Sequence, residues 1–425
     1  MPLWFIPLIY VGGSVVCGVL LPRAERAYFP LHTFDLSVSS AQACLSAAAS
    51  GMMALTGIVF AMAFVMVQFN AIAYSPRLVL WFARDRALFH SLGVFSATFI
   101  YALFTLAWID RDGSGNVPLF STLIVAIMLV ISMLLFARLV QRLTDLQITS
   151  VLKLIGDKGR AVIDDMFERR SERQPDEGTL AEARTDPPLG PTTQTLVYSG
   201  HPQTIAKVNV DALVRQAERS GGVIELVSAV GDTLVDGSVV LRVQGAAGRL
   251  AEKEMMRGIE LESERTFEQD PKYPIRLLVD IAIKALSPAI NDPTTAVQAI
   301  DQIEDLLRRL ARHDLDAGVL RDAKGVVRLV LPMPTWEDYL ALAFDEIRQF
   351  GTTSIQVLRR LRAALIGLAE TITTPARAEA VRRYLRHLDL VIDRSALDPE
   401  DKAMALQEDR QGLGLSRPRR EQRGG

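Results

Sequence analysis

The side chains that could do chemistry are concentrated in one stretch of the chain, residues 265–296. The stretch combines carboxylates, cations, an amide and two adjacent threonines, and it leads into a predicted helix that begins near residue 293. Free N–H groups at a helix start favour an anion, whereas carboxylate oxygens favour a cation such as Mg²⁺. The candidate ligand-binding residues are Arg265, Glu268, Asp270, Arg276, Asp280, Asn291, Asp292, Thr294 and Thr295.

Ordinary structural roles account for part of this pattern. Arg276, Asp280 and Lys284 are spaced four apart, which is typical of an ion-pair ladder on the surface of a helix. Asp292 precedes Pro293, the order expected when an aspartate caps a helix that begins with proline. Capping leaves the preceding asparagine and the two threonines without a stated role, so both interpretations stay open.

Known catalytic motifs give no support to an enzyme. The chain has no glycine-rich phosphate loop, no nucleophile elbow and no zinc-protease motif. Its five histidines are scattered without ligand spacing. We therefore name no catalytic residue, no metal ligand and no cofactor. The net charge of −2 gives no reason to expect a nucleic acid as a partner.

The elements that must position the candidate residues begin with a membrane region, residues 1–137. Four uncharged runs, residues 1–22, 36–76, 87–109 and 113–137, each exceed the roughly 18 residues that predict a transmembrane helix. Lys and Arg are more frequent in the second loop and after the fourth run than in the other two loops. This asymmetry predicts that both termini are cytoplasmic. The lipid bilayer is therefore an expected partner.

The second run is predicted to be the central helix of the bundle, because small residues recur along it at heptad spacing. In lipid, small side chains let helix backbones approach closely, and the resulting contact replaces the hydrophobic effect as the drive for association. Bulky residues on the opposite face, such as Leu45, Met52 and Val59, suit acyl chains. We call the small residues the packing seam and expect a homo-oligomer; the seam is Ala43, Ala47, Ser50, Ala54, Gly57 and Ala61.

No Asp, Glu, Lys or Arg occurs inside any of the four runs. Proton relays and ion-coupled carriers generally need an ionisable group within the membrane, so the sequence argues against an active pump. Neutral polar residues of the second run, Ser50, Thr56, Gln68 and Asn70, could line a passive pore. They could equally form hydrogen bonds between helices.

The predicted fold class is an integral membrane protein with four transmembrane α-helices followed by a cytoplasmic α+β region. An amphipathic connector helix, residues 138–168, is expected to lie on the inner leaflet or to pair with a second copy. Charge and proline content predict a disordered linker over 169–192 and a disordered basic tail over 411–425. Between them we expect a small β-rich subdomain, 193–247, and a mostly helical α+β subdomain, 248–410. Arginines such as Arg359 and Arg360 are predicted to form a solvated helix face.

Several segments resemble an uncharacterised bacterial family, the predicted-membrane-protein domain of unknown function twenty-two fifty-four. The resemblance is carried by residues 75–78, 268–270 and 278–282, and most specifically by the run Leu-Ser-Pro-Ala-Ile-Asn-Asp-Pro-Thr-Thr-Ala at 286–296. It implies an inner-membrane location and a four-helix amino-terminal region. It brings no established activity, so function stays open.

Three functions are compatible with these observations. The first is a passive ion or small-solute pore, gated by a cytoplasmic domain that senses a ligand or ion near Asp292. The second is a membrane-anchored scaffold or signalling module without transport. The third is a carboxylate-dependent enzyme at the inner leaflet, with Asp292 and Glu268 as its reactive groups.

Overall fold

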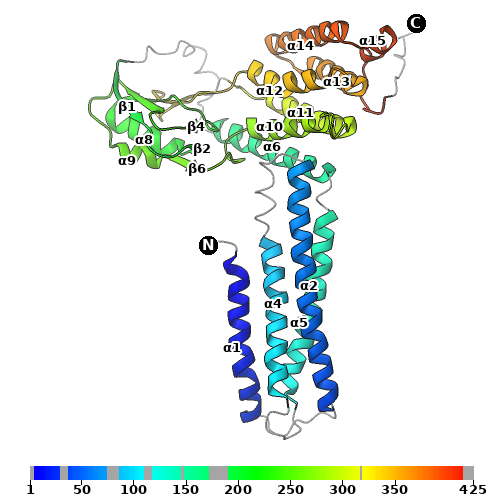
Figure 1. The fold of residues 1–425 in the computed structure, drawn as a ribbon. Helices are drawn as coiled ribbons and strands as arrows, with labels where there is room; N and C mark the ends of the chain where they lie inside the picture. The colour runs from blue at the N-terminus through cyan, green and yellow to red at the C-terminus, as the bar shows by residue number, and fades with distance from the viewer. Residues whose placement is uncertain are drawn as a thin grey trace, which may run out of the picture. The chain divides into compact units, whose positions relative to one another are not determined.

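The computed structural model describes residues 4–28, 37–73, 86–109, 117–144, 148–171, 190–315 and 318–414. These residues form two compact units, one within residues 1–147 and the other within residues 148–425 (Figure 1). We call the first the membrane unit and the second the soluble unit.

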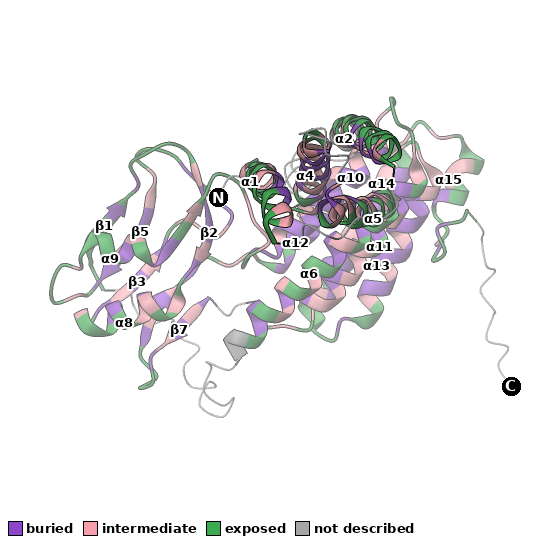
Figure 2. Ribbon diagram, turned by 90° about the horizontal axis from the view of Figure 1, so that it is seen from below, coloured by how far each residue is buried: buried purple, intermediate pink, exposed green. Residues whose placement is uncertain are grey.

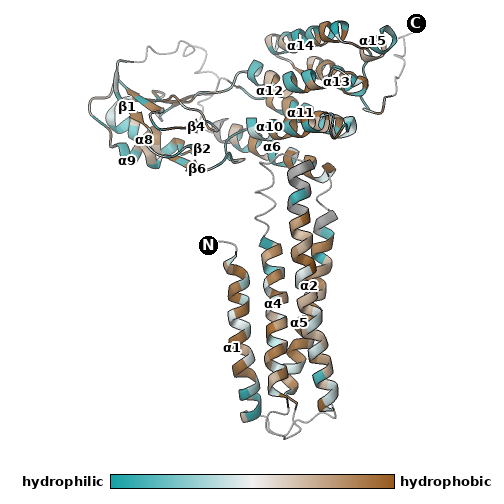
Figure 3. Cartoon of the chain, viewed as in Figure 1, coloured by the Kyte–Doolittle hydropathy of each residue, from teal (hydrophilic) through white to brown (hydrophobic). Residues whose placement is uncertain are grey.

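The described part of the membrane unit consists of four long helices: α1 (Phe5–Tyr28), α2 (Val38–Ala73), α4 (Arg86–Trp108) and α5 (Leu119–Thr144). Each is long and apolar enough to cross a membrane, which confirms the four predicted spans, and Figure 3 shows hydrophobic residues along most of their length. α2 has 36 residues. At about 1.5 Å per residue it is longer than the roughly 30 Å hydrocarbon core, so it must tilt or project beyond that core.

α4 is the central helix of the membrane unit, because α1, α2 and α5 all pack against it. Two glycines allow the close approach of α1. A Cβ atom on Gly18 would lie 2.7 Å from Cβ of Phe104, and a Cβ atom on Gly93 would lie 2.6 Å from the ring of Tyr10. The prediction that the second span is the central helix is therefore wrong.

The face of α2 that packs into the membrane unit is the bulky one. Leu45, Met52 and Val59 are buried in clusters that include Tyr101 and Phe95 of α4. The prediction that these three residues meet acyl chains is wrong, because the aromatic side chains of α4 provide large apolar partners for them. The packing seam lies elsewhere on α2, and all six of its residues are exposed within the chain.

The soluble unit opens with α6 (Ile148–Ser171), which begins inside the predicted connector, 138–168, and extends three residues into the predicted linker, 169–192. Its apolar face includes Val151, Ile155 and Ile163, all buried, and packs on α10 (Lys272–Ala285) and α11 (Pro293–Leu310) of the same unit. The prediction that this face lies on a leaflet or pairs with a second copy is wrong, because the chain's own helices cover it.

A glycine and a set of ion pairs join α6 to α11. A Cβ atom on Gly159 would lie 2.8 Å from both δ-carbons of Leu306. The guanidinium of Arg160 donates to Asp305 over 2.5 Å, and Nη1 of Arg309 lies 2.6 Å from Oδ2 of Asp164. α6 is thereby fixed to the helical core. The remaining described helices of this unit's carboxy-terminal part are α12 (Trp336–Phe350), α13 (Ile355–Thr371), α14 (Pro375–Arg394) and α15 (Pro399–Ala405). Figure 2 shows how much of α10, α11 and α13 is buried.

The β-rich part contains two sheets. One has five strands in the order β1 (Thr192–Val197), β5 (Val239–Gln244), β3 (Val223–Leu226), β8 (Val327–Val330) and β7 (Val319–Arg321). The other has the order β4 (Thr233–Leu234), β2 (Gln203–Val208) and β6 (Ile259–Glu262). α8 (Val210–Ser220) and α9 (Glu252–Arg257) complete this part.

The β-rich part is larger than its predicted range of 193–247. β8 pairs in parallel with β3, and β6 pairs antiparallel with β2, so strands from the predicted helical subdomain complete both sheets. The predicted boundary at residue 247 therefore cuts through both sheets. Composition could not show this, because pairing between strands that are distant in the sequence leaves no local pattern. The prediction of a disordered tail over 411–425 is wrong at its start, since Gln411 and Gly412 donate backbone N–H groups to buried Asp409. Residues 415–425 of that prediction lie outside the described residues.

Candidate functional site

The nine candidate ligand-binding residues occupy three places in the soluble unit. Arg265, Glu268 and Asp270 lie in the connection from β6 to α10, two residues lie on α10, and the rest surround the start of α11. Each place has to be judged by the contacts that its side chains make.

At the start of α11, capping explains most of the pattern. Oδ1 of Asp292 accepts the backbone N–H of Thr295 over 3.1 Å, and Oδ2 accepts the hydroxyl of Thr295 over 2.6 Å. Asn291 has φ 48°, in the left-handed region that asparagine tolerates better than most residues. Thr294 is exposed. The asparagine and one threonine therefore have roles in the turn, without a ligand.

Capping predicts a small, specific effect of mutation. Asp292→Ala should lower the free energy of unfolding of the soluble unit by about 1 kcal/mol, whereas Asp292→Asn, which also caps helices, should lower it by less than half as much. Denaturant titration of the full-length protein in detergent measures both values. Equal losses in the two variants would show that the negative charge of Asp292, beyond its capping geometry, is needed.

On α10, Arg276 joins two helices. Its Nε donates to Oδ1 of Asp280 over 2.6 Å, and Nη2 donates to Oε2 of Glu346 on α12 over 2.8 Å. The hydrogen bonds to Glu346 are the largest cause of the raised pKa of Arg276, and the same contact lowers the pKa of Glu346. The pair at positions 276 and 280 is therefore part of a helix–helix contact whose third member, Glu346, the sequence spacing did not reveal.

A cavity of the soluble unit lies between α6 and the β-rich part, and we call it the cleft. Its volume is about 440 Å³, within the 300–1,000 Å³ that is usual for small-molecule sites. α6 contributes Asp165 and Met166, the junction of β2 and α8 contributes residues 207–211, and the end of α9 and the start of β6 contribute Arg257, Gly258 and Glu260. Val230, Gln269, Leu320 and Leu331 complete the wall.

Two charged side chains of the cleft are available to a ligand. Arg257 and Glu260 are exposed, and no residue in the described part of the chain binds either side chain. Lys207, by contrast, forms an ion pair of 3.2 Å with Glu268. A guanidinium and a carboxylate at one site can bind the acidic group and a donor group of one polar molecule. Sequence analysis missed both residues. Arg257 ends the short helix α9 and Glu260 lies on the strand β6, and two charged residues three positions apart across such a boundary form no known motif.

The carboxylates named for an enzyme are not part of the cleft. Asp292 caps α11, and Glu268 reaches the cleft only through its ion pair with Lys207. The described residues also contain no cluster of three or more His, Cys, Asp or Glu side chains that could hold a metal ion.

Asp270 is the candidate residue with the least ordinary environment. It is 2% exposed, and burial raises the pKa of its carboxyl group. Nε of Arg265 lies 3.4 Å from Oδ2 of Asp270. Gly231 lies against this pair, since a Cβ atom there would come 2.8 Å from Nε of Arg265. The pair therefore connects the loop after β3 to the start of α10.

Three of the four possible pore-lining residues have side chains that the structure describes. Ser50 and Gln68 are exposed on α2, Thr56 donates to the Met52 carbonyl over 2.7 Å, and the side chain of Asn70 lies outside the described residues. Hydroxyls buried in the bundle also bond to helix carbonyls, as Ser132 does to Met128 over 2.7 Å. Thr56 and Ser132 are thus satisfied by carbonyl groups of their own helices.

The family model described as "Predicted membrane protein (DUF2254)" matches residues 1–366, which confirms the resemblance seen in the sequence. The chain is 26% identical over 417 residues to the uncharacterized protein Rv1290c of Mycobacterium tuberculosis strain H37Rv, which covers 95% of this chain and 78% of that protein. The uncharacterized protein Mb1321c of Mycobacterium bovis matches with the same identity and coverage. No solved structure matches the chain.

Proposed function

The chain belongs to the DUF2254 family of predicted membrane proteins, and on that premise we propose that it is a membrane-anchored signalling module whose soluble unit binds a small polar ligand. In this proposal the spans lie in the inner membrane, and both termini and the soluble unit are cytoplasmic. The single observation that carries the proposal is the cleft, with Arg257 and Glu260 available in its wall.

The cleft supports a signalling role because one of its walls is α6. Asp165 and Met166 come from this helix, which begins at Ile148, only a few residues after the fourth span ends at Thr144. A ligand that contacts α6 could therefore shift the helix that follows the fourth span in the sequence. α6 packs on α11 and is joined to it by two ion pairs, so we expect a shift of one helix to move the other.

Reversing one charge in the cleft should abolish ligand retention. We expect a small molecule to remain bound to the full-length protein purified from membranes, and Glu260→Lys to reduce its amount at least tenfold. Glu262→Lys is the matched control, because Glu262 is exposed on the same strand but does not line the cleft. Native mass spectrometry measures the bound fraction. Equal retention by the two variants, or no bound molecule in the wild type, would contradict the proposal.

A homo-oligomeric pore is the second candidate function, and the exposed packing seam supports it. Ser50 and Ala54 of the seam line a groove with Phe99 and Leu103 of α4. Small residues that are exposed within the described part of the chain can pack against a helix of a second copy. In such an assembly Ser50, Thr56, Gln68 and Asn70 would be candidates to line the passage.

Bulky residues in the seam should block assembly without harming the single chain. A Cβ atom on Gly57 would meet nothing within 4 Å, and the same is true of Gly51, which is exposed on α2 but outside the seam. We expect Gly57→Leu to shift the protein toward monomers in size-exclusion chromatography with light scattering, and Gly51→Leu to leave the oligomer unchanged. Identical elution of both variants and the wild type would exclude the seam as an interface, and the pore with it.

A further inference from the structure

Part of the cleft wall is apolar. Val210 and Val230 line the cleft and are half-buried, and Met166 and Leu331 line it with 7% and 9% of their surface exposed. Covering apolar surface of this kind stabilises a complex by roughly 25 cal/mol per Å². The wall therefore favours a ligand with an apolar body, because a small inorganic ion would leave these side chains without a partner.

The charged side chains that line the cleft carry both signs. Three of them are carboxylates and two are cations: Asp165, Asp211, Glu260, Lys207 and Arg257. Glu268, which forms an ion pair of 3.2 Å with Lys207, brings a further carboxylate to one of the cations. Negative groups thus outnumber positive ones, which disfavours a ligand with several negative charges, such as a nucleotide.

Glu260 has a vacant position for a cation. It lies directly opposite Lys207 where β6 pairs with β2, and side chains at directly opposite positions project from the same face of a sheet. Nζ of Lys207 nevertheless pairs with Glu268. Within the described part of the chain the exposed carboxylate of Glu260 meets no cation, so an ammonium group of a ligand can bind it.

Arg257 and Glu260 are held near one another by the junction of α9 and β6. Gly258 lies between them, and a Cβ atom there would come 2.8 Å from Cδ2 of Leu213 on α8. The backbone N–H of Gly258 also donates to the Met255 carbonyl over 3.0 Å. Three residues of chain separate two Cα atoms by at most about 11 Å. One small molecule can therefore reach both side chains, and a guanidinium binds a carboxylate through two parallel hydrogen bonds.

We propose that the ligand of the cleft is a small zwitterion with an apolar body, in the chemical class of an aliphatic α-amino acid. Its carboxylate binds the guanidinium of Arg257, its ammonium group binds the carboxylate of Glu260, and its hydrocarbon part lies against Met166 and Leu331. The inference rests on the proposed function of the cleft and adds the chemical class of the ligand.

Three probes that share one hydrocarbon body test the two charges separately in the full-length protein in detergent. L-Leucine carries both charges, isoamylamine lacks the carboxylate, and 4-methylpentanoate lacks the ammonium group. The readout is the methyl resonance of ¹³C-labelled Met166, which lines the cleft, with exposed Met404 on α15 as the reference for general solvent effects. We expect L-leucine to cause a saturable shift at Met166, and each of the other probes to bind at least tenfold more weakly.

Two variants assign each charge of the ligand to its partner. Glu260→Gln should remove the preference for L-leucine over 4-methylpentanoate and keep the preference over isoamylamine. Arg257→Gln should have the opposite effect. Glu262→Gln is the matched control, since Glu262 is exposed on the same strand outside the cleft, and it should change neither preference.

The results separate failure of the ligand class from failure of the proposed function. A singly charged probe that binds as well as L-leucine would overturn the zwitterion, as would variants that keep both preferences. If no probe shifts Met166 while the purified protein retains a small molecule in native mass spectrometry, the ligand class is wrong and the function of the cleft stands. If no probe binds and the purified protein retains no molecule, both are wrong.

Discussion

Gly159→Leu should destabilise the soluble unit by about 3 kcal/mol. A Cβ atom at this position would lie 2.8 Å from both δ-carbons of Leu306 and 3.1 Å from Cβ of Pro274. Leu306 is fully buried on α11 and has little room to move. Leucine at position 159 would therefore push α6 away from α10 and α11 and weaken the ion pairs that join them. Denaturant titration followed by the fluorescence of Trp336, the one tryptophan of residues 148–425, measures the loss.

Gly156 on the same helix is the matched control. A Cβ atom there would meet the amide end of Gln302, a half-buried side chain that can turn aside. Because alanine favours helix over glycine by up to about 1 kcal/mol, Gly156→Ala should be neutral or stabilising, whereas Gly159→Ala should lose stability despite the same propensity gain. If both alanine variants are stabilised, α6 does not pack on α11 in this way.

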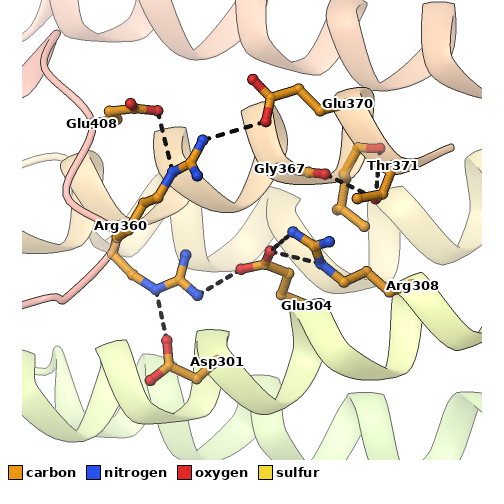
Figure 4. A network of polar contacts seen from close by, with 10 residues as sticks. Asp301, Glu304, Arg308, Arg360, Gly367, Glu370, Thr371 and Glu408 are labelled. Carbon is orange, nitrogen blue, oxygen red and sulfur yellow. Dashed lines mark hydrogen bonds and ion pairs between the residues drawn. The ribbon is translucent and has the colours of Figure 1, made fainter. Parts of the chain in front are cut away.

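Arg360→Met should cost about 3 kcal/mol, because it removes the shared cation of a largely buried network. The guanidinium of Arg360, whose side chain is 8% exposed, donates to Asp301 and Glu304 of α11 over 2.6 Å each (Figure 4). Its loss leaves Glu304, 12% exposed, with Arg308 as its remaining ion-pair partner among the described residues. The prediction that Arg360 belongs to a solvated face is wrong, because the position faces α11 from α13.

An exposed arginine nearby gives the comparison. Arg410 is 63% exposed and lies 3.3 Å from Glu370, and exposed ion pairs of this kind contribute about 0–1 kcal/mol. Arg410→Met should therefore change the free energy of unfolding much less than Arg360→Met does, in the same denaturant titration. Similar small losses in both variants would show that α11 and α13 do not depend on the buried network.

The membrane spans and the helix caps are the features that could be predicted from the sequence, because each depends on residues that are close together in the chain. The four spans follow from uncharged length. The structure also shows a capping box of Thr335 and Asp338 at the start of the helix Trp336–Phe350, a motif of residues three positions apart. Asp292 caps α11, as its position before Pro293 indicates. In each case the interacting groups lie within a few residues of one another, so the sequence alone contains the information.

The cleft could not be predicted in this way. Its wall brings Asp165 together with Arg257 and Glu260, and the intervening strands pair in an order that no local pattern specifies. One usable signal was overlooked: Gly156 and Gly159 lie three residues apart in an amphipathic helix, where a close helix neighbour is the usual reason for glycine. The choice of face on α2 also needed the structure, because small and bulky faces can each pack in lipid.

The central claim is that the soluble unit binds a small polar ligand in the cleft against α6. The most direct test is a cryo-electron microscopy structure of the full-length protein purified from its own membranes into nanodiscs without added ligand. We predict density for a small molecule that contacts Arg257 and Glu260 and touches α6 near Asp165. A cleft that contains only solvent, or that is closed by the chain's own residues, would contradict the proposed function.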